Sequence, residues 1–169
     1  GGYPGDQTES VLWKLDNICI ELLAPAGDTA VCQQLRERIA SDGGGVYAMV
    51  LACEDIAETT REIREHGLHP TEPTEGLTKD EPSGAYRRFL QSELDPSETA
   101  GIRILITEHL SEAGELSPSL SVEDEDAAVF AGDHVVIMTT LPERALALFS
   151  EKLGIRLALD KTFEGRKTR

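Results

Sequence analysis

The sequence predicts an α+β fold in which a strand–helix unit occurs twice. Residues 132–160 divide into an apolar, β-branched strand over 134–139, an amphipathic helix that starts near Pro142 and stops at Gly154, and a second strand. Residues 46–68 repeat the pattern with an apolar strand, an acidic turn, an amphipathic helix and a glycine stop. Strands alternating with helices in this way indicate a mixed fold with at least one sheet.

The repeat extends beyond the helices to the strands that end each unit. Setting His134 over Ala48 aligns the apolar strand residues of the two copies, and residues 17–22 align with residues 101–106. The middle of the chain therefore contains one complete βαβββ module. The first segment matches only the last two strands of such a module, and the last segment matches only its strand–helix–strand start.

Each segment follows from local sequence signals. Residues 11–23 form two apolar arms around an Asp-Asn turn, and residues 29–40 carry helical periodicity. Residues 69–84 lack periodicity, so we expect a long loop with at most a short edge strand. The predicted organisation is a half-module with its linker helix, a complete module, an acidic linker and a second half-module: 1–44, 45–110, 111–131 and 132–169.

Composition excludes several classes of partner. The 169 residues carry a formal net charge of −15, which repels phosphate backbones and anionic lipid, so we expect neither nucleic-acid nor membrane binding. No apolar run approaches the roughly 20 residues of a membrane span. The first ten residues lack the apolar region of a secretory signal, and the three cysteines contain no CxxC pair. We therefore expect a cytoplasmic protein with reduced thiols.

Several short motifs, each weak alone, occur in an order that resembles the vicinal-oxygen-chelate superfamily of glyoxalases, bleomycin-resistance proteins and extradiol dioxygenases. The likeness spans residues 11–160 and implies paired βαβββ modules that form a cup-shaped mixed sheet. Its motifs are Asp133-His134-Val135-Val136-Ile137, Pro142-Glu143-Arg144-Ala145, Leu153-Gly154-Ile155-Arg156-Leu157, Cys19-Ile20-Glu21-Leu22-Leu23-Ala24-Pro25, the helix entry at Asp55-Ile56, and Asp95-Pro96 with Thr99-Ala100-Gly101-Ile102.

The order of modules departs from this family pattern, in which complete modules follow one another. Three explanations fit the two half-modules. The chain is a piece of a longer multi-module protein, or it is circularly permuted so that its two ends close one module, or the halves are exchanged between subunits. Because unfinished modules leave unpaired sheet edges, we expect a homodimer.

The resemblance implies a divalent metal such as Zn, Ni, Mn or Fe inside the cup, held by residues of the first and last strands of each module. Carried over to this sequence, the ligands are His134 and Glu21, and Glu21 is also the candidate general base. The counterpart positions in the complete module hold Ala48 and Leu105, which cannot bind metal. Alternative interpretations are that His134 is a hydrogen-bonded rim or core residue and that Glu21 pairs with Arg103 or Lys14.

Two classes of function follow from the resemblance. One is a metal-dependent lyase or isomerase that acts on a small oxygen-rich substrate. The other is a metal-free small-molecule-binding protein of the antibiotic-sequestering type, which the loss of ligands at Ala48 and Leu105 favours. A third alternative is a fragment without independent activity. The remaining histidines, His66, His69 and His109, are expected to be solvated surface residues.

Overall fold

The computed structural model describes residues 2–3, 6–79, 84–111, 129 and 131–157. The described strands are β1 (Gly2–Tyr3), β2 (Thr8–Lys14), β3 (Cys19–Pro25), β4 (Met49–Cys53), β5 (Thr74–Lys79), β6 (Tyr86–Glu93) and β7 (Ile104–His109). The described helices are α1 (Ala30–Asp42), α2 (Ile56–Glu65) and α3 (Pro142–Leu146), the last continuing as the π-helix η2 (Ala147–Lys152). None of these helices is long and apolar enough to cross a membrane.

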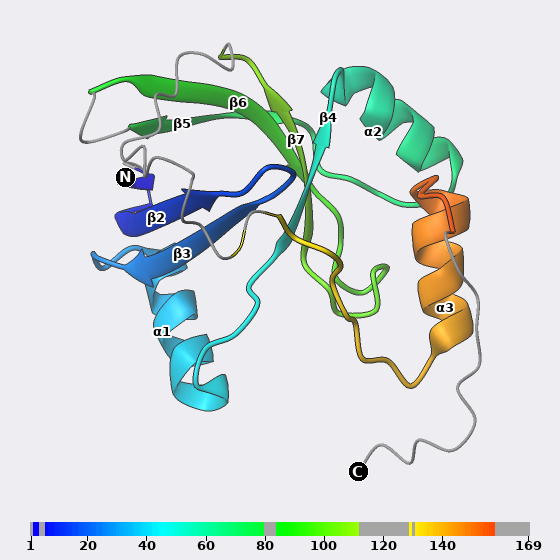
Figure 1. Cartoon of the computed structure of the whole chain (residues 1–169), viewed down its shortest axis with the longest axis horizontal. Helices are drawn as coiled ribbons and strands as arrows, with labels where there is room; N and C mark the ends of the chain where they lie inside the picture. The colour runs from blue at the N-terminus through cyan, green and yellow to red at the C-terminus, as the bar shows by residue number, and fades with distance from the viewer. Residues whose placement is uncertain (1, 4–5, 80–83, 112–128, 130, 158–169) are drawn as a thin grey trace.

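The strands form one curved sheet in the order β3-β2-β1-β5-β6-β7-β4. Only the β4–β7 pair is parallel, and the other neighbouring strands are antiparallel. Figure 1 shows β5 and β6 above and β2 and β3 below, so that the sheet curls into a cup. The predicted α+β class with a cup-shaped mixed sheet is confirmed.

The middle of the chain contains its strands and helix in the predicted βαβββ order, from β4 through α2 to β7. β4 returns beside β7, with Met49 opposite Ile104. One expectation was wrong here. Residues 74–79, placed in a loop with at most a short edge strand, form β5, which lies inside the sheet between β1 and β6. Its backbone pairing on both sides compensates for a sequence with little strand periodicity.

The hydrophobic core lies between the sheet and the helices α2 and η2, which sit together on one side of the sheet (Figure 1). The buried core residues are Ile56, Ile63, Leu68, Leu94, Ile104, Ile106 and Leu148. Two carboxylates fix the start of α2. Asp55 accepts a hydrogen bond from the Glu58 amide, and Glu108 of β7 accepts one from the Ile56 amide at 2.9 Å. Both satisfy amides that a helix start leaves unpaired.

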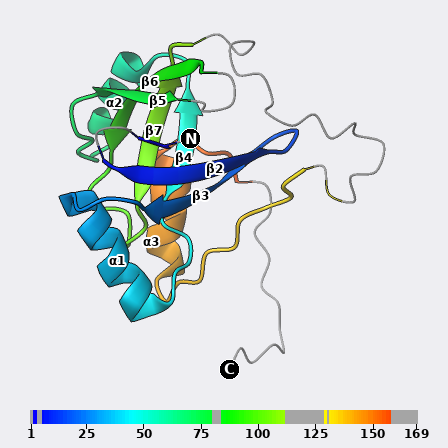
Figure 2. The same cartoon turned by 90° about the vertical axis from the view of Figure 1, so that its left-hand side faces the viewer.

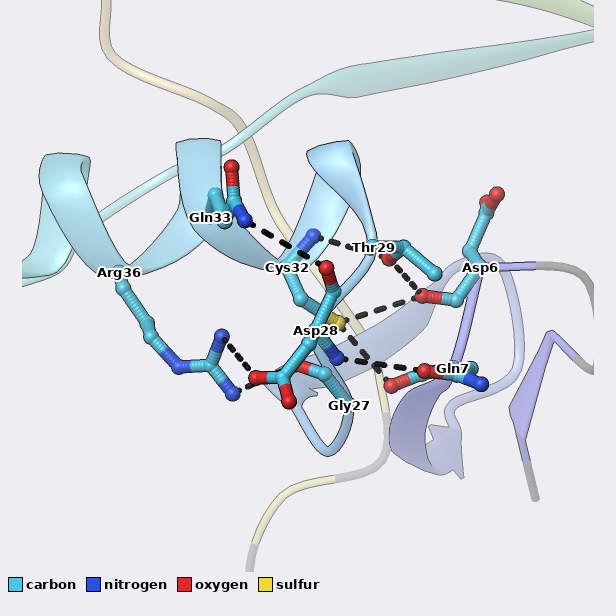
Figure 3. A network of polar contacts seen from close by, with 8 residues as sticks. All are labelled: Asp6, Gln7, Gly27, Asp28, Thr29, Cys32, Gln33 and Arg36. Carbon is cyan, nitrogen blue, oxygen red and sulfur yellow. Dashed lines mark hydrogen bonds and ion pairs between the residues drawn. The ribbon is translucent and has the colours of Figure 1, made fainter.

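A polar network ties the start of α1 to the turn before β2 (Figure 3). The Thr29 hydroxyl accepts from the Cys32 amide and donates to the Asp6 carbonyl at 2.6 Å. The buried Cys32 thiol donates to the carbonyls of Asp6 and Gln7. Arg36 donates to the Gly27 carbonyl at 2.6 Å. Cys32 is thus a buried structural thiol. The cysteine composition suggested three buried reduced thiols, which was wrong for Cys19: all three are free, but Cys19 is exposed and Cys53 is half-buried.

The C-terminal segment differs from the sequence prediction. Residues 134–139, predicted as a strand, pair with no strand in the described part of the chain, and neither do residues 155–157. Gly132 exchanges two hydrogen bonds with the Asn17 side chain at the β2–β3 turn, and the chain then runs away from β3 towards α3 (Figures 1 and 2). A strand needs a neighbouring edge for its backbone groups, and this path gives residues 134–139 none.

Candidate functional site

Strand register assigns each sheet residue to one of two faces, because directly opposite residues in neighbouring strands point the same way. Ile104 and Ile106 pack in the core beneath α2, so their side of the sheet is called the helix face, and the other side is the cup face. Following the residue pairs from β7 to β3 places Ile20 and Leu22 on the helix face and Glu21 on the cup face.

The cup face is unusually rich in polar side chains for the inside of a curved sheet. A sheet face without covering helices is either solvated or a place for a ligand, and hydrogen-bonding groups on a concave surface favour the second. Its polar residues come from β2, β5, β6 and β7: Thr8, Ser10, Thr74, Thr78, Arg87, Gln91, Glu93, Thr107 and His109.

Gln91 and Thr107 form the centre of this polar surface. They lie opposite each other on β6 and β7, and the Gln91 amide donates to the Thr107 hydroxyl at 3.1 Å. Thr107 is buried and Gln91 is half-buried. Since Thr107 is 3% exposed, the groups of this pair that can meet an oxygen-containing ligand are the amide oxygen and the second amide proton of Gln91.

An ion pair borders this centre on one side. Arg103 donates two hydrogen bonds to the Glu93 carboxylate, at 2.7 and 2.9 Å, and its guanidinium lies over the Tyr47 ring at 4.5 Å. The hydrogen bonds to Glu93 raise the pKa of Arg103, outweighing the opposite effect of its partial burial. Arg103, one of the two partners that the sequence suggested for Glu21, is therefore engaged with Glu93.

A second cation borders the other side. An Arg87 guanidinium nitrogen lies 2.9 Å from Nε2 of His109. Partial burial and the neighbouring Arg87 charge both lower the pKa of His109, so the imidazole is neutral near neutral pH and accepts a hydrogen bond from Arg87. No described carboxylate forms an ion pair with Arg87. His109 lies at an exposed strand end, as the sequence predicted, but its contact with Arg87 was not foreseen.

Two threonines on neighbouring parts of the cup face have hydroxyls that are buried without a hydrogen-bond partner among the described residues: Thr8 and Thr78. A buried unpaired hydroxyl costs about 1–3 kcal/mol, so such groups are uncommon and call for an explanation. Both lie on the same face as Gln91 and Thr107. They add unused hydrogen-bonding capacity to the polar side of the sheet.

The structure separates the two predicted metal ligands. Glu21 lies on the cup face of β3, an edge strand, and is exposed. His134 lies outside the sheet, is exposed and bonds the neighbouring Asp133 carboxylate. Leu105, the counterpart of Glu21 in the repeat, also lies on the cup face, opposite Glu93. The two positions that the repeat aligns, Glu21 and Leu105, therefore lie on the same face of the sheet.

The described residues do not fit a metal centre within one chain. Across the described ranges, no group of three or more His, Cys, Asp or Glu side chains is placed to hold a metal ion. Of the positions that the resemblance assigns to metal ligands, Glu21 lies on the sheet and its equivalent in the repeat is Leu105, which cannot bind metal. His134 lies on a segment that pairs with no described strand.

A surface hollow of about 760 Å³ lies elsewhere, between the turn at 96–101 and residues 138–144. Its one charged lining residue is Arg144, which donates to the Ser97 carbonyl at 2.6 Å. The hollow therefore contains no acid–base pair. The hollow lies where the C-terminal segment contacts the central module.

Sequence reasoning missed the centre of the cup face. Arg87, Phe89, Gln91 and Glu93 occupy every second position of β6 and so share one face. The other face also carries polar residues, Arg88 and Ser92, so the sequence of β6 shows no clear alternation of polar and apolar residues. Which side of the sheet each face occupies depends on long-range pairing, so the sequence of the strand alone could not identify it. Gly76 shows how closely the two strands pack there, because a Cβ at this position would lie 2.2 Å from the Phe89 ring.

Comparison with known proteins supports the fold and goes no further. No protein-family model matches the sequence, and no curated protein matches it. A crystal structure of a hypothetical protein from Bacillus halodurans C-125 is similar, with a TM-score of 0.51 and 21% identity over 66% of this chain and 74% of that one. At this identity the likeness concerns the fold alone.

Two methylmalonyl-CoA epimerase structures also match. The Mycobacterium tuberculosis enzyme gives a TM-score of 0.47 and 16% identity over 64% of this chain and 67% of that one. A Streptomyces coelicolor variant in complex with 2-nitronate-propionyl-CoA gives 0.48 and 16% over 66% and 76%. With TM-scores below 0.5 these two likenesses carry no argument about this chain, and its membership of the vicinal-oxygen-chelate superfamily stays a prediction.

Proposed function

We propose that this chain binds a small oxygen-rich molecule on the cup face, around Gln91 and Thr107. The observation that carries the proposal is the set of polar side chains on the cup face, opposite the helix face, whose apolar residues on β7 are buried beneath α2. Polar groups at the base of a concave surface orient a ligand by hydrogen bonds. Phe89 and Leu105 lie on the same face but are 6% and 9% exposed, so they offer a ligand little apolar surface.

The ligand chemistry follows from the groups that are available. Gln91 offers an amide donor and acceptor, the threonines offer hydroxyls, and Arg87 offers a guanidinium without an ion-pair partner among the described residues. Arginine binds carboxylates in a planar, two-point geometry. A small carboxylate with an adjacent hydroxyl or carbonyl oxygen fits this set best.

Thermal unfolding with a panel of 2-hydroxy and 2-oxo carboxylates tests the proposal. We expect at least one compound to raise the unfolding midpoint of the native chain, since binding to the folded state stabilises it. The variant Gln91→Leu should lose most of that rise. Gln33→Leu, the same change on the exposed surface of α1, should keep it. Equal responses in all three proteins would place binding away from Gln91.

The finer function, a metal-dependent lyase or isomerase, is a second proposal. Its support is the Glu21 carboxylate on the cup face, at the position where the repeat and the resemblance expect a ligand or base. Elemental analysis of the purified protein, with His134→Ala and Glu21→Ala as variants, tests it. Stoichiometric metal that is lost in both variants would support it, with a site completed by groups outside the described residues of one chain. Folded protein that takes up no metal after reloading with Zn, Ni, Mn or Fe contradicts it and leaves metal-free binding.

A further inference from the structure

Arg87 and His109 form a contact between two groups that can each carry a positive charge. Both lie on the cup face, Arg87 on β6 and His109 on β7, and a guanidinium nitrogen of Arg87 is 2.9 Å from Nε2 of His109. A charged imidazole has only donors, so the contact requires a neutral imidazole that accepts the hydrogen bond. These two residues are called the Arg87–His109 pair.

Strand register sets this pair beside Gln91. His109 lies directly opposite Phe89, and Arg87 and Gln91 flank Phe89 at two residues' distance on the same face. His109 is therefore a diagonal neighbour of both, at a Cβ separation of roughly 7 Å. The Phe89 ring lies over Gly76 of β5, where an added Cβ would be 2.2 Å from it, so the ring leaves the β7 side of Gln91 to His109. This spacing suits a small carboxylate that reaches from the Gln91 amide to the pair.

Arg87 is half-buried and forms no ion pair with a carboxylate among the described residues, although acidic residues outnumber lysine and arginine in this chain by 31 to 16. The next residue, Arg88, pairs with Glu75 at 2.8 Å, and Arg103 on the cup face pairs with Glu93 at 2.7 Å. A guanidinium that faces an imidazole keeps further N–H groups in the planar arrangement that binds a carboxylate.

Arg87 is also the charged group that acts on His109. On β7 the neighbouring Glu108 turns to the helix side, where it accepts a hydrogen bond from the Ile56 amide at 2.9 Å. Glu54, which follows β4 beside β7, is exposed to solvent. Burial, and after it the charge of Arg87, lowers the pKa of His109. Without an anion beside the pair, protonation of His109 is therefore unfavourable.

A bound carboxylate would reverse this effect. Its negative charge favours the protonated imidazole, which can donate a charge-assisted hydrogen bond to it while Arg87 donates others. The pKa of His109 is then higher in the complex than in the free protein, so the complex holds more protons. Affinity consequently rises as pH falls from the pKa of the bound state to that of the free state, and this group adds no pH dependence outside that interval.

We propose that the carboxylate of the cup-face ligand lies between Arg87 and His109, and that its binding takes up a proton at His109. The inference rests on the proposed function, that the cup face binds a small carboxylate, and adds the subsite and the proton. His109 then determines specificity together with Arg87. An amide of the same shape as the carboxylate has no negative charge, so it should bind weakly and without proton uptake.

Isothermal titration calorimetry of the full chain tests the proposal with the 2-hydroxy or 2-oxo carboxylate that gives the largest thermal stabilisation. Proton uptake appears as a difference in the observed binding enthalpy between two buffers of different ionisation enthalpy at the same pH. We expect uptake between about pH 5 and about pH 7, the range in which histidine titrates. Over part of this range the affinity should rise by up to about tenfold per pH unit, the limit for one proton.

Two histidine variants separate this proton from the charge of the whole protein. His109→Gln keeps a polar side chain that cannot become charged, so its complex should form without the uptake and with a flatter pH dependence. His66→Gln, the same change at an exposed histidine at the end of α2, should behave like the native chain. Any general rise in anion affinity, as a protein of formal charge −15 gains protons, is common to both variants.

Variants of Arg87 test the other half of the pair. Arg87→Gln should weaken binding of the carboxylate by about tenfold or more, the loss expected for hydrogen bonds to a charged group. Arg87→Lys keeps the charge without the planar arrangement of donors and should recover part of that loss. Circular dichroism at each pH shows whether each variant is folded, and the two-buffer measurement on the native chain needs no variant.

The outcomes distinguish this inference from the proposed function. Binding that depends on Gln91 but gives the same enthalpy in both buffers would overturn the subsite and leave the proposed function standing. Equal proton uptake in His109→Gln and in the native chain would do the same. Failure of every carboxylate in the panel to bind the folded chain would overturn both.

Discussion

Glu98 shows how single residues tie the turn before β7 to the loop after α2. Its carboxylate accepts a hydrogen bond from the His69 amide at 2.9 Å and lies 2.6 Å from His69 Nδ1. The hydrogen bonds from His69 lower the pKa of Glu98 below its ordinary value of 4.5. Asp95 in the same turn is held in its charged form by the Ser97 amide, which lowers its pKa as well.

Because the pKa values of Glu98 and Asp95 are lowered in the folded state, the free energy of unfolding depends on pH in the acidic range. Because the folded state holds Glu98 ionised where the unfolded state protonates it, the stabilisation is present above the ordinary pKa of 4.5 and is lost as pH falls through the lower folded value. The unfolding temperature of the native chain should therefore fall more between about pH 6 and about pH 3 than that of Glu98→Gln. Glu62→Gln, on the exposed side of α2, should follow the native curve. Parallel curves for Glu98→Gln and native protein would contradict this role.

At the same scale, the sequence could place some site residues on a face but could not show which face mattered. Strict alternation put Glu21 on the same side of its strand as Cys19 and Leu23, and the register agrees. It could not reveal that Gln91 faces Thr107, since their 16-residue separation is closed only by the β6–β7 pairing. Nor could it show that Glu108 turns to the helix side and binds the α2 amide.

At the scale of elements, α2 was predictable because its signals are local. Asp55 precedes an amphipathic stretch, and Gly67 follows it with a positive φ of 77°. Two elements were predicted wrongly: β5 was expected to be mostly loop and is a strand, and residues 134–139 were expected to be a strand and pair with no described strand. Thr74–Lys79 became a strand because two neighbours supply hydrogen bonds, whereas residues 134–139 have strand composition and no neighbour. Strand identity depends on partners more than helix identity does.

The α2 cap gives an element-scale prediction. Asp55→Ala removes the side-chain acceptor for the Glu58 amide and should lower the free energy of unfolding by about 1 kcal/mol. Urea denaturation measures the change. Glu54→Ala, the neighbouring carboxylate outside the helix, should change stability by no more than about 0.5 kcal/mol. A loss that is equal in both variants would show that the helix start does not depend on Asp55.

At the scale of the whole molecule, the internal repeat predicted more than any single motif. It aligned Glu21 with Leu105, and the strand register places both side chains on the cup face. It could not show where the C-terminal helix packs, because Leu148 reaches the core of the central module through contacts distant in sequence.

The central claim is that the cup face binds the ligand. The most direct measurement is a titration of ¹⁵N-labelled protein with the carboxylate that gives the largest thermal stabilisation, followed by amide chemical shifts. We predict the largest changes at Gln91 and Thr107, with the Gln91 side-chain amide among them, and small changes at Ile63 and Leu148 on the helix side. Changes centred on the hollow around Ser97 and Arg144, with Gln91 and Thr107 unmoved, would contradict the account.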